Sequence, residues 1–250
     1  MLDVYGVLVY MVNRLATRCS RGDLILKGGT ALNEKLKREL PGYFRATRDI
    51  DFHVGSIETY REVFGDVEEW LNSGTDKYTF ITVKSRTSSN TSAGFVFEVS
   101  DGVNKDRVGI DLNVSPINTI TIDTTSTFTI PTYDLYMMLA DKMSVVCSPS
   151  IYRRIKDIYD IFVILHLRDL NKAILRSSLD SKRPGIVCME NFMILPDNYP
   201  QLSHAYEKYR GFPDVDFIDI ACLVTSFMWS YMSGREELTR WDHNQLIWVG

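Results

Sequence analysis

Two aspartates separated by one residue begin an alternating polar and apolar segment, Asp49 to Val54. In a strand, residues i and i+2 project from the same face, so the carboxylates of Asp49 and Asp51 would lie roughly 7 Å apart at the backbone. Carboxylates this close repel each other unless a cation lies between them. Mg²⁺ is often held by one or two carboxylates together with substrate phosphates. The pair therefore indicates a divalent-metal site about as strongly as it indicates a solvated strand face.

A third aspartate, Asp111, lies within a second alternating segment, 107–114. On a strand next to Asp49 and Asp51, its carboxylate could complete a two-metal site or act as a base toward an attacking hydroxyl. An isolated aspartate on a strand is more often merely solvated. His53 would share the face of Asp49 and Asp51, and we expect it to be a structural histidine with satisfied hydrogen bonds.

The run Lys27-Gly28-Gly29-Thr30 follows a short apolar segment and precedes a helical pattern. Two glycines allow positive φ angles and a close approach of the backbone to a ligand. Backbone amides in such a turn, followed by a helix N-terminus, attract phosphate oxygens. A plain Gly-Gly turn with Thr30 as the helix N-cap is the commoner interpretation of this pattern taken alone.

A basic and acidic pattern follows in the second half of the chain. Lys142 lies on one expected helix, and Arg153, Lys156, Asp157 and Asp160 share a face of the next. This spacing permits ion pairs between residues three and four apart, which is typical of a salt-bridged surface helix. The functional alternative is a triphosphate clamp, with Lys142 on the phosphates and Asp157 or Asp160 orienting the cations.

Hydrophobic periodicity predicts the elements that must position these residues. The first part of the chain is expected to contain helices over 2–20, 30–40 and 56–71, and strands over 24–26, 49–54, 78–84, 95–99, 107–114 and 128–130. Segment 85–92 is expected to be a polar hairpin loop. The second part is expected to be all helical, with helices over 133–146 and 151–167 and further helices broken at Pro184, Pro196, Pro200 and Pro213. We therefore predict an α+β domain over 1–132 and a helical domain over 133–250.

The composition excludes several classes of protein. A chain of 250 residues with 45% hydrophobic and 24% charged residues is neither collagen, coiled coil nor disordered. Its four cysteines are too far apart for a zinc ribbon and predict reduced thiols in a cytoplasmic protein. No signal peptide or membrane-spanning run is apparent, so no membrane partner is expected. The net charge of −4 argues against broad binding to nucleic acid, although a local basic patch stays open.

The order of these motifs is more specific than any one of them. The chain resembles the nucleotidyltransferase-superfamily toxins of the AbiEii/AbiGii type, which act in type IV toxin–antitoxin and abortive-infection systems. The matching segments are 26–32, 45–52, 110–111, 141–142 and 154–160. The resemblance covers roughly residues 22–165. It implies a nucleotidyltransferase fold, in which a mixed β-sheet with flanking helices is followed by a C-terminal helical bundle that contributes nucleotide-binding residues.

The resemblance also implies roles for particular residues. Asp49 and Asp51 would hold Mg²⁺ or Mn²⁺, with Asp111 as a third carboxylate ligand or as the base. The residues implied to bind the nucleotide are Lys27, Gly28, Gly29, Thr30, Arg48, Lys142, Asp157 and Asp160.

The implied activity is the transfer of NMP from an NTP to an acceptor hydroxyl, and pyrophosphate is the leaving group. The implied acceptor is an RNA, such as a tRNA, and the implied protein partner is a cognate antitoxin. Residues that could line an RNA path are Arg45, Arg48, Arg153, Arg154 and Lys156. Two alternatives stay open: a nucleotidyltransferase that modifies an antibiotic or another small molecule, and a non-catalytic nucleotide-binding module.

Overall fold

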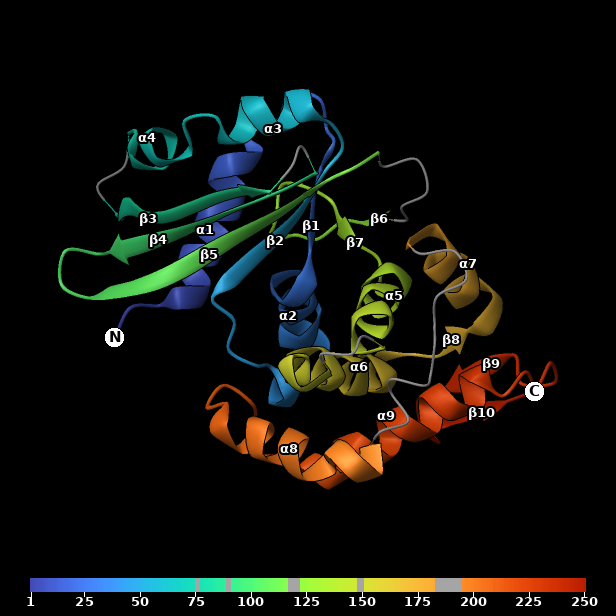
Figure 1. Cartoon of the computed structure of the whole chain (residues 1–250). Coiled ribbons are helices and arrows are strands. Elements are labelled where there is room, and N and C mark those ends of the chain that lie inside the picture. Colours follow the sequence, from blue (N-terminus) through green and yellow to red (C-terminus); the bar gives the residue numbers. More distant parts are fainter. Residues whose placement is uncertain (75–76, 89–90, 117–121, 148–150, 183–194) are drawn as a thin grey trace. The chain divides into compact units, whose positions relative to one another are not determined.

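The computed structural model describes residues 1–74, 77–88, 91–116, 122–147, 151–182 and 195–250 (Figure 1). By their contacts the residues form two compact units. Unit 1 comprises Met1–Lys35 and Ala46–Tyr133, and unit 2 comprises Leu36–Arg45 and Asp134–Gly250. The domains expected from the sequence, 1–132 and 133–250, stay a prediction. Among the described helices, none has both the length and the apolar character needed to cross a membrane.

Unit 1 is built on a seven-stranded mixed sheet in the order β3-β4-β5-β2-β1-β7-β6. Its strands are β1 (Leu24–Lys27), β2 (Asp49–Val54), β3 (Thr79–Ser88), β4 (Ser92–Ser100), β5 (Lys105–Val114), β6 (Ile122–Asp123) and β7 (Thr132–Tyr133). The pairs β2–β5 and β1–β7 are parallel, and the other neighbouring strands are antiparallel. This mixed sheet with flanking helices confirms the predicted α+β class.

One face of the sheet is covered by helices α1 (Val4–Ala16), α3 (Ile57–Phe64) and α4 (Val67–Asn72) (Figure 1). The apolar residues of the central strands point toward these helices, because strand side chains alternate between the two faces. Ile50 and Phe52 of β2 are fully buried, and the Phe52 ring lies 5.7 Å from that of Phe64 on α3. The aspartates of β2 therefore project from the opposite face.

Helix α2 (Gly28–Glu39) follows β1 without an intervening loop, and a short 3₁₀ turn, η1 (Pro41–Tyr43), comes after it. Leu32 and Leu36 on this helix are almost completely buried. The prediction that a helix precedes Pro41-Gly42 is confirmed, although the helix begins two residues earlier than expected.

Unit 2 is mainly helical. Its larger segment, Asp134–Gly250, contains the helices α5 (Leu135–Val146), η3 (Ile151–Arg153), α6 (Ile155–Leu167), α7 (Lys172–Lys182), α8 (Leu195–Lys208) and α9 (Phe217–Met232). The expectation of an all-helical second part is wrong in one respect, because a small antiparallel sheet joins β8 (Leu170–Asn171), β9 (Arg240–Asp242) and β10 (Ile247–Val249). Trp241 and Trp248 of this sheet contact the ring of Phe227, which identifies them as core residues.

Two predictions in unit 1 need correction. The single helix expected over 56–71 is two helices, because the backbone leaves the helical conformation at Asp66, where φ is −132° and ψ is 44°. The strand expected over 128–130 is absent from this described segment. The side chain of Asn13 on α1 instead bonds to the Thr127 carbonyl and the Thr129 amide, which takes up the backbone groups that a neighbouring strand would need.

The structure also differs from the predictions in segment 85–92 and at the prolines of the second part of the chain. The hairpin loop expected over 85–92 is mostly strand, since β3 extends to Ser88 and β4 starts at Ser92. The breaks expected at Pro196 and Pro200 are not found, because both prolines belong to α8. Pro196 lies in its first turn, where proline is tolerated, and Pro200 lies inside the helix. Pro213 does lie between helices, as predicted, whereas Pro184 is outside the described residues.

Candidate active site

The three predicted catalytic aspartates lie on one face of the sheet in unit 1, which we call the carboxylate face (Asp49, Asp51 and Asp111). Strands β2 and β5 are parallel, and Asp51 is in register with Asp111. Register partners on neighbouring strands project to the same side and lie about 4.8 Å apart along the hydrogen-bonding direction. The sheet pairing thus places side by side two carboxylates that are 60 residues apart in the sequence.

The same register extends across five strands. Arg86 on β3 pairs with Gly94 on β4, Gly94 with Asp111, Asp111 with Asp51, and Asp51 with Lys27 on β1. This row therefore carries a cationic residue at each end and two carboxylates in the middle. A guanidinium nitrogen of Arg86 donates to Asp111 Oδ1 at 2.6 Å, and these two side chains are 67% and 50% exposed. Arg86 is not among the predicted site residues, because the sequence pattern predicts a loop at that position.

Glycines lie directly against all three carboxylates. Gly28 has a φ of +70°, and a Cβ atom added to it would collide with the carboxylate of Asp51. A Cβ at Gly109 would come within 2.7 Å of Asp49 Oδ1, and one at Gly94 within 2.8 Å of Asp111 Oδ1. The predicted need for glycine at position 28 therefore has a definite steric cause.

The predicted phosphate-binding turn, Lys27 to Thr30, joins β1 directly to α2. Gly29 and Thr30 are buried, and the Thr30 hydroxyl donates to the main-chain oxygen of Asp49 at 2.7 Å. Thr30 thus links the start of α2 to the start of β2, and it is not the N-cap, because the helix already begins at Gly28. Contact between this turn and a triphosphate stays a prediction.

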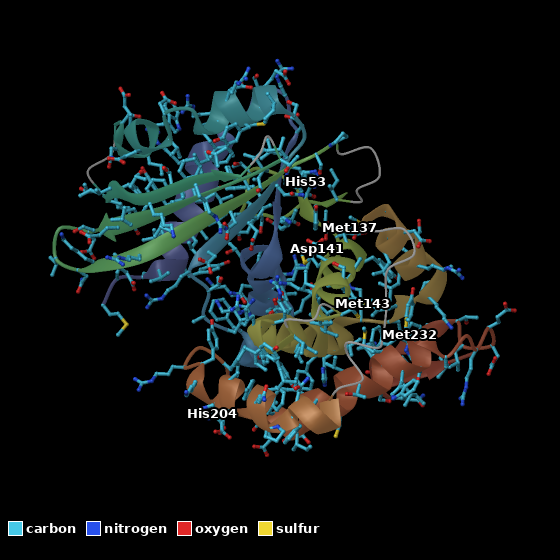
Figure 2. The ribbon with its side chains drawn as sticks, in the orientation of Figure 1. His53, Met137, Asp141, Met143, His204 and Met232 are labelled. Atoms are coloured by element: carbon cyan, nitrogen blue, oxygen red, sulfur yellow. The ribbon has the colours of Figure 1, made fainter. Side chains whose placement is uncertain are left out.

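Two other predicted residues of unit 1 have clear partners. Arg48, with a side chain that is 61% exposed, forms an ion pair with Asp106 on β5. His53 is buried on β2 (Figure 2), and its ring nitrogens lie 2.7 Å from the Tyr133 hydroxyl and 2.8 Å from the Ser115 carbonyl. Both nitrogens are therefore engaged, as expected of a structural histidine.

The remaining predicted residues meet in unit 2, in what we call the buried ion-pair cluster (Arg45, Lys142, Asp157 and Asp160). Arg45 binds both carboxylate oxygens of Asp160, at 2.6 and 2.8 Å. Lys142 Nζ lies 2.7 Å from Asp157 Oδ1 and 2.9 Å from Asp160 Oδ2. Lys142 is on α5, directly after Asp141, which Figure 2 labels. The four side chains are between 1% and 15% exposed.

Charge pairing outweighs burial in this cluster. Burial alone would raise the pKa of Asp160, but Arg45 and Lys142 lower that pKa to about 2. Burial would likewise lower the pKa of Lys142, but Asp160 and Asp157 raise it above its ordinary value. At neutral pH, Asp160 is therefore ionised and Lys142 protonated.

The cluster corrects one part of the predicted RNA path. Arg45 is only 3% exposed and is held by Asp160, so its guanidinium does not line an exposed surface. Its partner is 115 residues away in the sequence, which is why local spacing could not reveal the pair. Arg154 is more exposed and lies 3.8 Å from Asp157, while Lys156 Nζ lies 5.1 Å from the centre of the Tyr209 ring.

Nucleotidyltransferases generally use divalent metals, and the carboxylate oxygens of the carboxylate face are the candidate ligands for one. Among the residues that the structure describes, no group of three or more His, Cys, Asp or Glu side chains is arranged to hold a metal ion. Mg²⁺ rarely requires such a cage, since it commonly takes one or two carboxylates and completes its shell with water and substrate phosphates. Asp49 and Asp51, beside the glycine turn that starts α2, fit that kind of site.

The fold, a mixed sheet with flanking helices and further helices after it, is of the nucleotidyltransferase-like class. The structure is similar to that of a candidate nucleotidyltransferase from Helicobacter pylori, with a TM-score of 0.58 and 13% identity over 98% of this chain and 95% of that one. It is also similar to JHP933 from Helicobacter pylori, with a TM-score of 0.54 and 15% identity over 96% and 90% of the two chains. Identities this low show the fold alone.

The family follows from the sequence. The family described as nucleotidyl transferase AbiEii toxin, type IV TA system, matches residues 11–201. The chain therefore belongs to the AbiEii nucleotidyltransferase toxin family, and the predicted resemblance is confirmed. A comparison with curated protein sequences finds no match.

Proposed function

We propose that this chain is a metal-dependent nucleotidyltransferase that moves NMP from an NTP to a hydroxyl group of an RNA acceptor. The observation that carries the proposal is the register of Asp51 with Asp111 on parallel strands, next to a glycine turn that lies against the Asp51 carboxylate. Paired carboxylates beside a helix N-terminus can serve both a cation and a polyphosphate.

The residues of unit 1 take different roles in the proposed reaction. Asp49 and Asp51 would hold Mg²⁺ or Mn²⁺, which would supply positive charge to neutralise the phosphates. The backbone amides at Gly28 and Gly29 bind the triphosphate at the start of α2, with Thr30 holding that turn to β2 and with Lys27 and Arg48 as nearby cationic groups. Asp111 accepts the proton of the acceptor hydroxyl, whose oxygen attacks the α-phosphorus, and pyrophosphate leaves.

Unit 2 is proposed to supply the nucleotide-binding lysine of the family. Lys142 is a compact positive charge suited to phosphate oxygens, and Asp157 and Asp160 hold its ammonium group in place. The geometry favours a positioning role for Asp160, because this carboxylate is 1% exposed and already accepts from Arg45 and Lys142.

Two observations favour this proposal over the alternatives. A non-catalytic nucleotide-binding module has no need for Asp49, Asp51 and Asp111 on one face together with Lys142, and all four are present. The type IV toxin–antitoxin family suggests a cognate antitoxin as the protein partner. A nucleotidyltransferase that modifies a small molecule would share the catalytic residues, so only the acceptor separates it from the RNA-modifying enzyme.

The test supplies the protein and Mg²⁺ with each α-labelled NTP in turn, together with cellular RNA and a small-molecule fraction. Asp51→Asn is expected to reduce labelling at least about 10³-fold, because it removes half of the paired metal-binding charge at the reacting phosphate. Glu98→Gln, on the same sheet and ion-paired with Lys105, is the matched control. Full activity of Asp51→Asn would contradict the catalytic assignment, and label only in the small-molecule fraction would contradict the RNA acceptor.

A further inference from the structure

A pocket of about 310 Å³ lies next to Asp111 in unit 1, and it is lined by Arg86, Ser92, Ala93, Asp111 and Leu112. Ser92 is in register with Asn113, two residues after Asp111, so its side chain shares the carboxylate face. The pocket extends from Asp111 toward β4 and β3. The glycine turn and Asp51 lie on the other side of Asp111, toward β2 and β1. Asp111 therefore separates two areas of the same face.

Arg86 places a positive charge at this pocket by reaching across β4. Its guanidinium bonds to Asp111 Oδ1 on β5, over Gly94 of the intervening strand. A Cβ at Gly94 would come within 2.8 Å of both Arg86 Nε and Asp111 Oδ1. The missing side chain at position 94 is thus what lets the guanidinium and the carboxylate meet. The Arg86 side chain is 67% exposed, so a ligand in the pocket can reach it.

We infer that this pocket is the acceptor subsite and that Arg86 binds the phosphodiester nearest to the attacking hydroxyl of an RNA strand. The inference rests on the proposed function, which places the triphosphate at Gly28 and the metal at Asp49 and Asp51. In-line displacement needs the acceptor oxygen on the side of the α-phosphorus opposite the leaving group. Asp111 lies between the two areas, where a base must lie to take the acceptor proton.

The chemistry of the pocket selects the acceptor. The planar guanidinium of Arg86 matches a phosphate in a bidentate fashion, and the Asp111 carboxylate accepts the proton of the adjacent hydroxyl. The acceptor oxygen forms a bond to the α-phosphorus as the bond from that phosphorus to the bridging oxygen breaks, and pyrophosphate leaves with the electron pair. A cationic small molecule, such as an aminated sugar, would be repelled by the positive charge of Arg86. The pocket therefore favours an RNA acceptor over a basic antibiotic.

The test compares Arg86→Ala and Arg86→Lys with Arg107→Ala. Arg107 is an exposed arginine on the same strand as Asp111, four residues and roughly 13 Å away, so its removal changes the net charge equally. Binding of a short 5′-fluorescein-labelled single-stranded RNA is followed by anisotropy without metal or NTP. Arg86→Ala is expected to weaken binding about 10-fold or more, with partial recovery in Arg86→Lys and little change in Arg107→Ala.

Kinetics with RNA and Mg²⁺ provide the second measurement. Arg86→Ala is expected to raise KM for RNA about 10-fold while KM for the NTP stays the same, and melting temperatures check the folding of each variant. Equal weakening of RNA binding by Arg86→Ala and Arg107→Ala would overturn the subsite, and so would a change confined to KM for the NTP. If wild-type protein labels RNA and Arg86→Ala behaves identically, the subsite fails and the proposed function stands. If Arg86→Ala alone weakens RNA binding but wild-type protein labels no RNA, the proposed function fails and the binding site stands.

Discussion

The carboxylate face of unit 1 and the buried ion-pair cluster of unit 2 use similar residue types in opposite ways. The face places Asp51 and Asp111 side by side, and the Arg86 partner of Asp111 is 67% exposed. The cluster brings together two cationic and two anionic side chains that are at most 15% exposed. The first arrangement keeps charge open to solvent, while the second balances charge within the protein.

The difference in solvent access changes what each group of charges can do. Exposed ion pairs exchange partners at little cost, because water screens them. Buried pairs have lost their hydration, so removal of one partner leaves an uncompensated charge. We therefore expect the carboxylate face to exchange protein partners for cation and substrate, and the buried cluster to keep Lys142 fixed. Substitutions that affect the two regions differently can test this contrast.

The largest expected effect is on the stability of the buried cluster. Asp160→Ala should lower the free energy of unfolding by about 3–5 kcal/mol, because Arg45 and Lys142 would lose a shared carboxylate in a buried site. Asp111→Ala, on the exposed face, should change it by only about 0.5 kcal/mol. Urea denaturation of both variants measures the contrast, and equal losses would show that burial does not distinguish the two regions.

The next largest effect concerns the glycine turn against Asp51. Gly28→Ala should lower the free energy of unfolding by about 2–4 kcal/mol, since it adds a collision with the Asp51 carboxylate to the strain of a positive φ. Gly102→Ala is the matched control, because Gly102 has a φ of +89° but no atom near an added Cβ. We expect a loss of only about 1 kcal/mol there. Equal losses would mean that the Asp51 carboxylate moves away freely.

Much of unit 1 was predictable because its signals are local. The alternation from Asp49 to Val54 defines β2 to the residue, and the apolar run before Gly28 identifies β1. What local patterns could not supply was the pairing of β2 with β5, since any strand of the sheet could neighbour another. The shared face of Asp51 and Asp111 depends on that pairing. Local patterns do not predict that these two aspartates lie together, and only the family resemblance implies it.

The partners of the charged residues were harder to predict. Arg86 lies in a polar segment whose Ser and Thr residues are typical of a loop, but cross-strand pairing with β4 makes it a strand. The bond between Arg45 and Asp160 joins residues 115 positions apart, so helix spacing instead suggested a surface ion-pair pattern around Asp160. Both failures arise because tertiary contacts decide which charges are buried.

A pH dependence follows from the lowered pKa of Asp160. This carboxyl has a pKa of about 2 in the folded protein against an ordinary value of 3.8. A lowered folded-state pKa gives stability that is present above the ordinary value and is lost as the pH falls through the folded value. Stability should therefore fall by about 2 kcal/mol from this group between about pH 4 and pH 2. Unfolding measured across that range should show a shallower slope in Asp160→Asn, and an unchanged slope would contradict the assignment.

The smallest expected effect is the coupling between Arg86 and Asp111. A double-mutant cycle of Arg86→Ala and Asp111→Ala should give about 0.2–1 kcal/mol, decreasing as salt is added, because both side chains are half or more exposed. The same cycle with Lys142→Met and Asp160→Ala should give a larger value that salt hardly changes. A strong, salt-independent coupling at Arg86 would mean that Asp111 is locked to its partner and poorly suited to accept a proton. A weak coupling is what lets Arg86 turn to a phosphate and Asp111 to a hydroxyl without a large loss of stability.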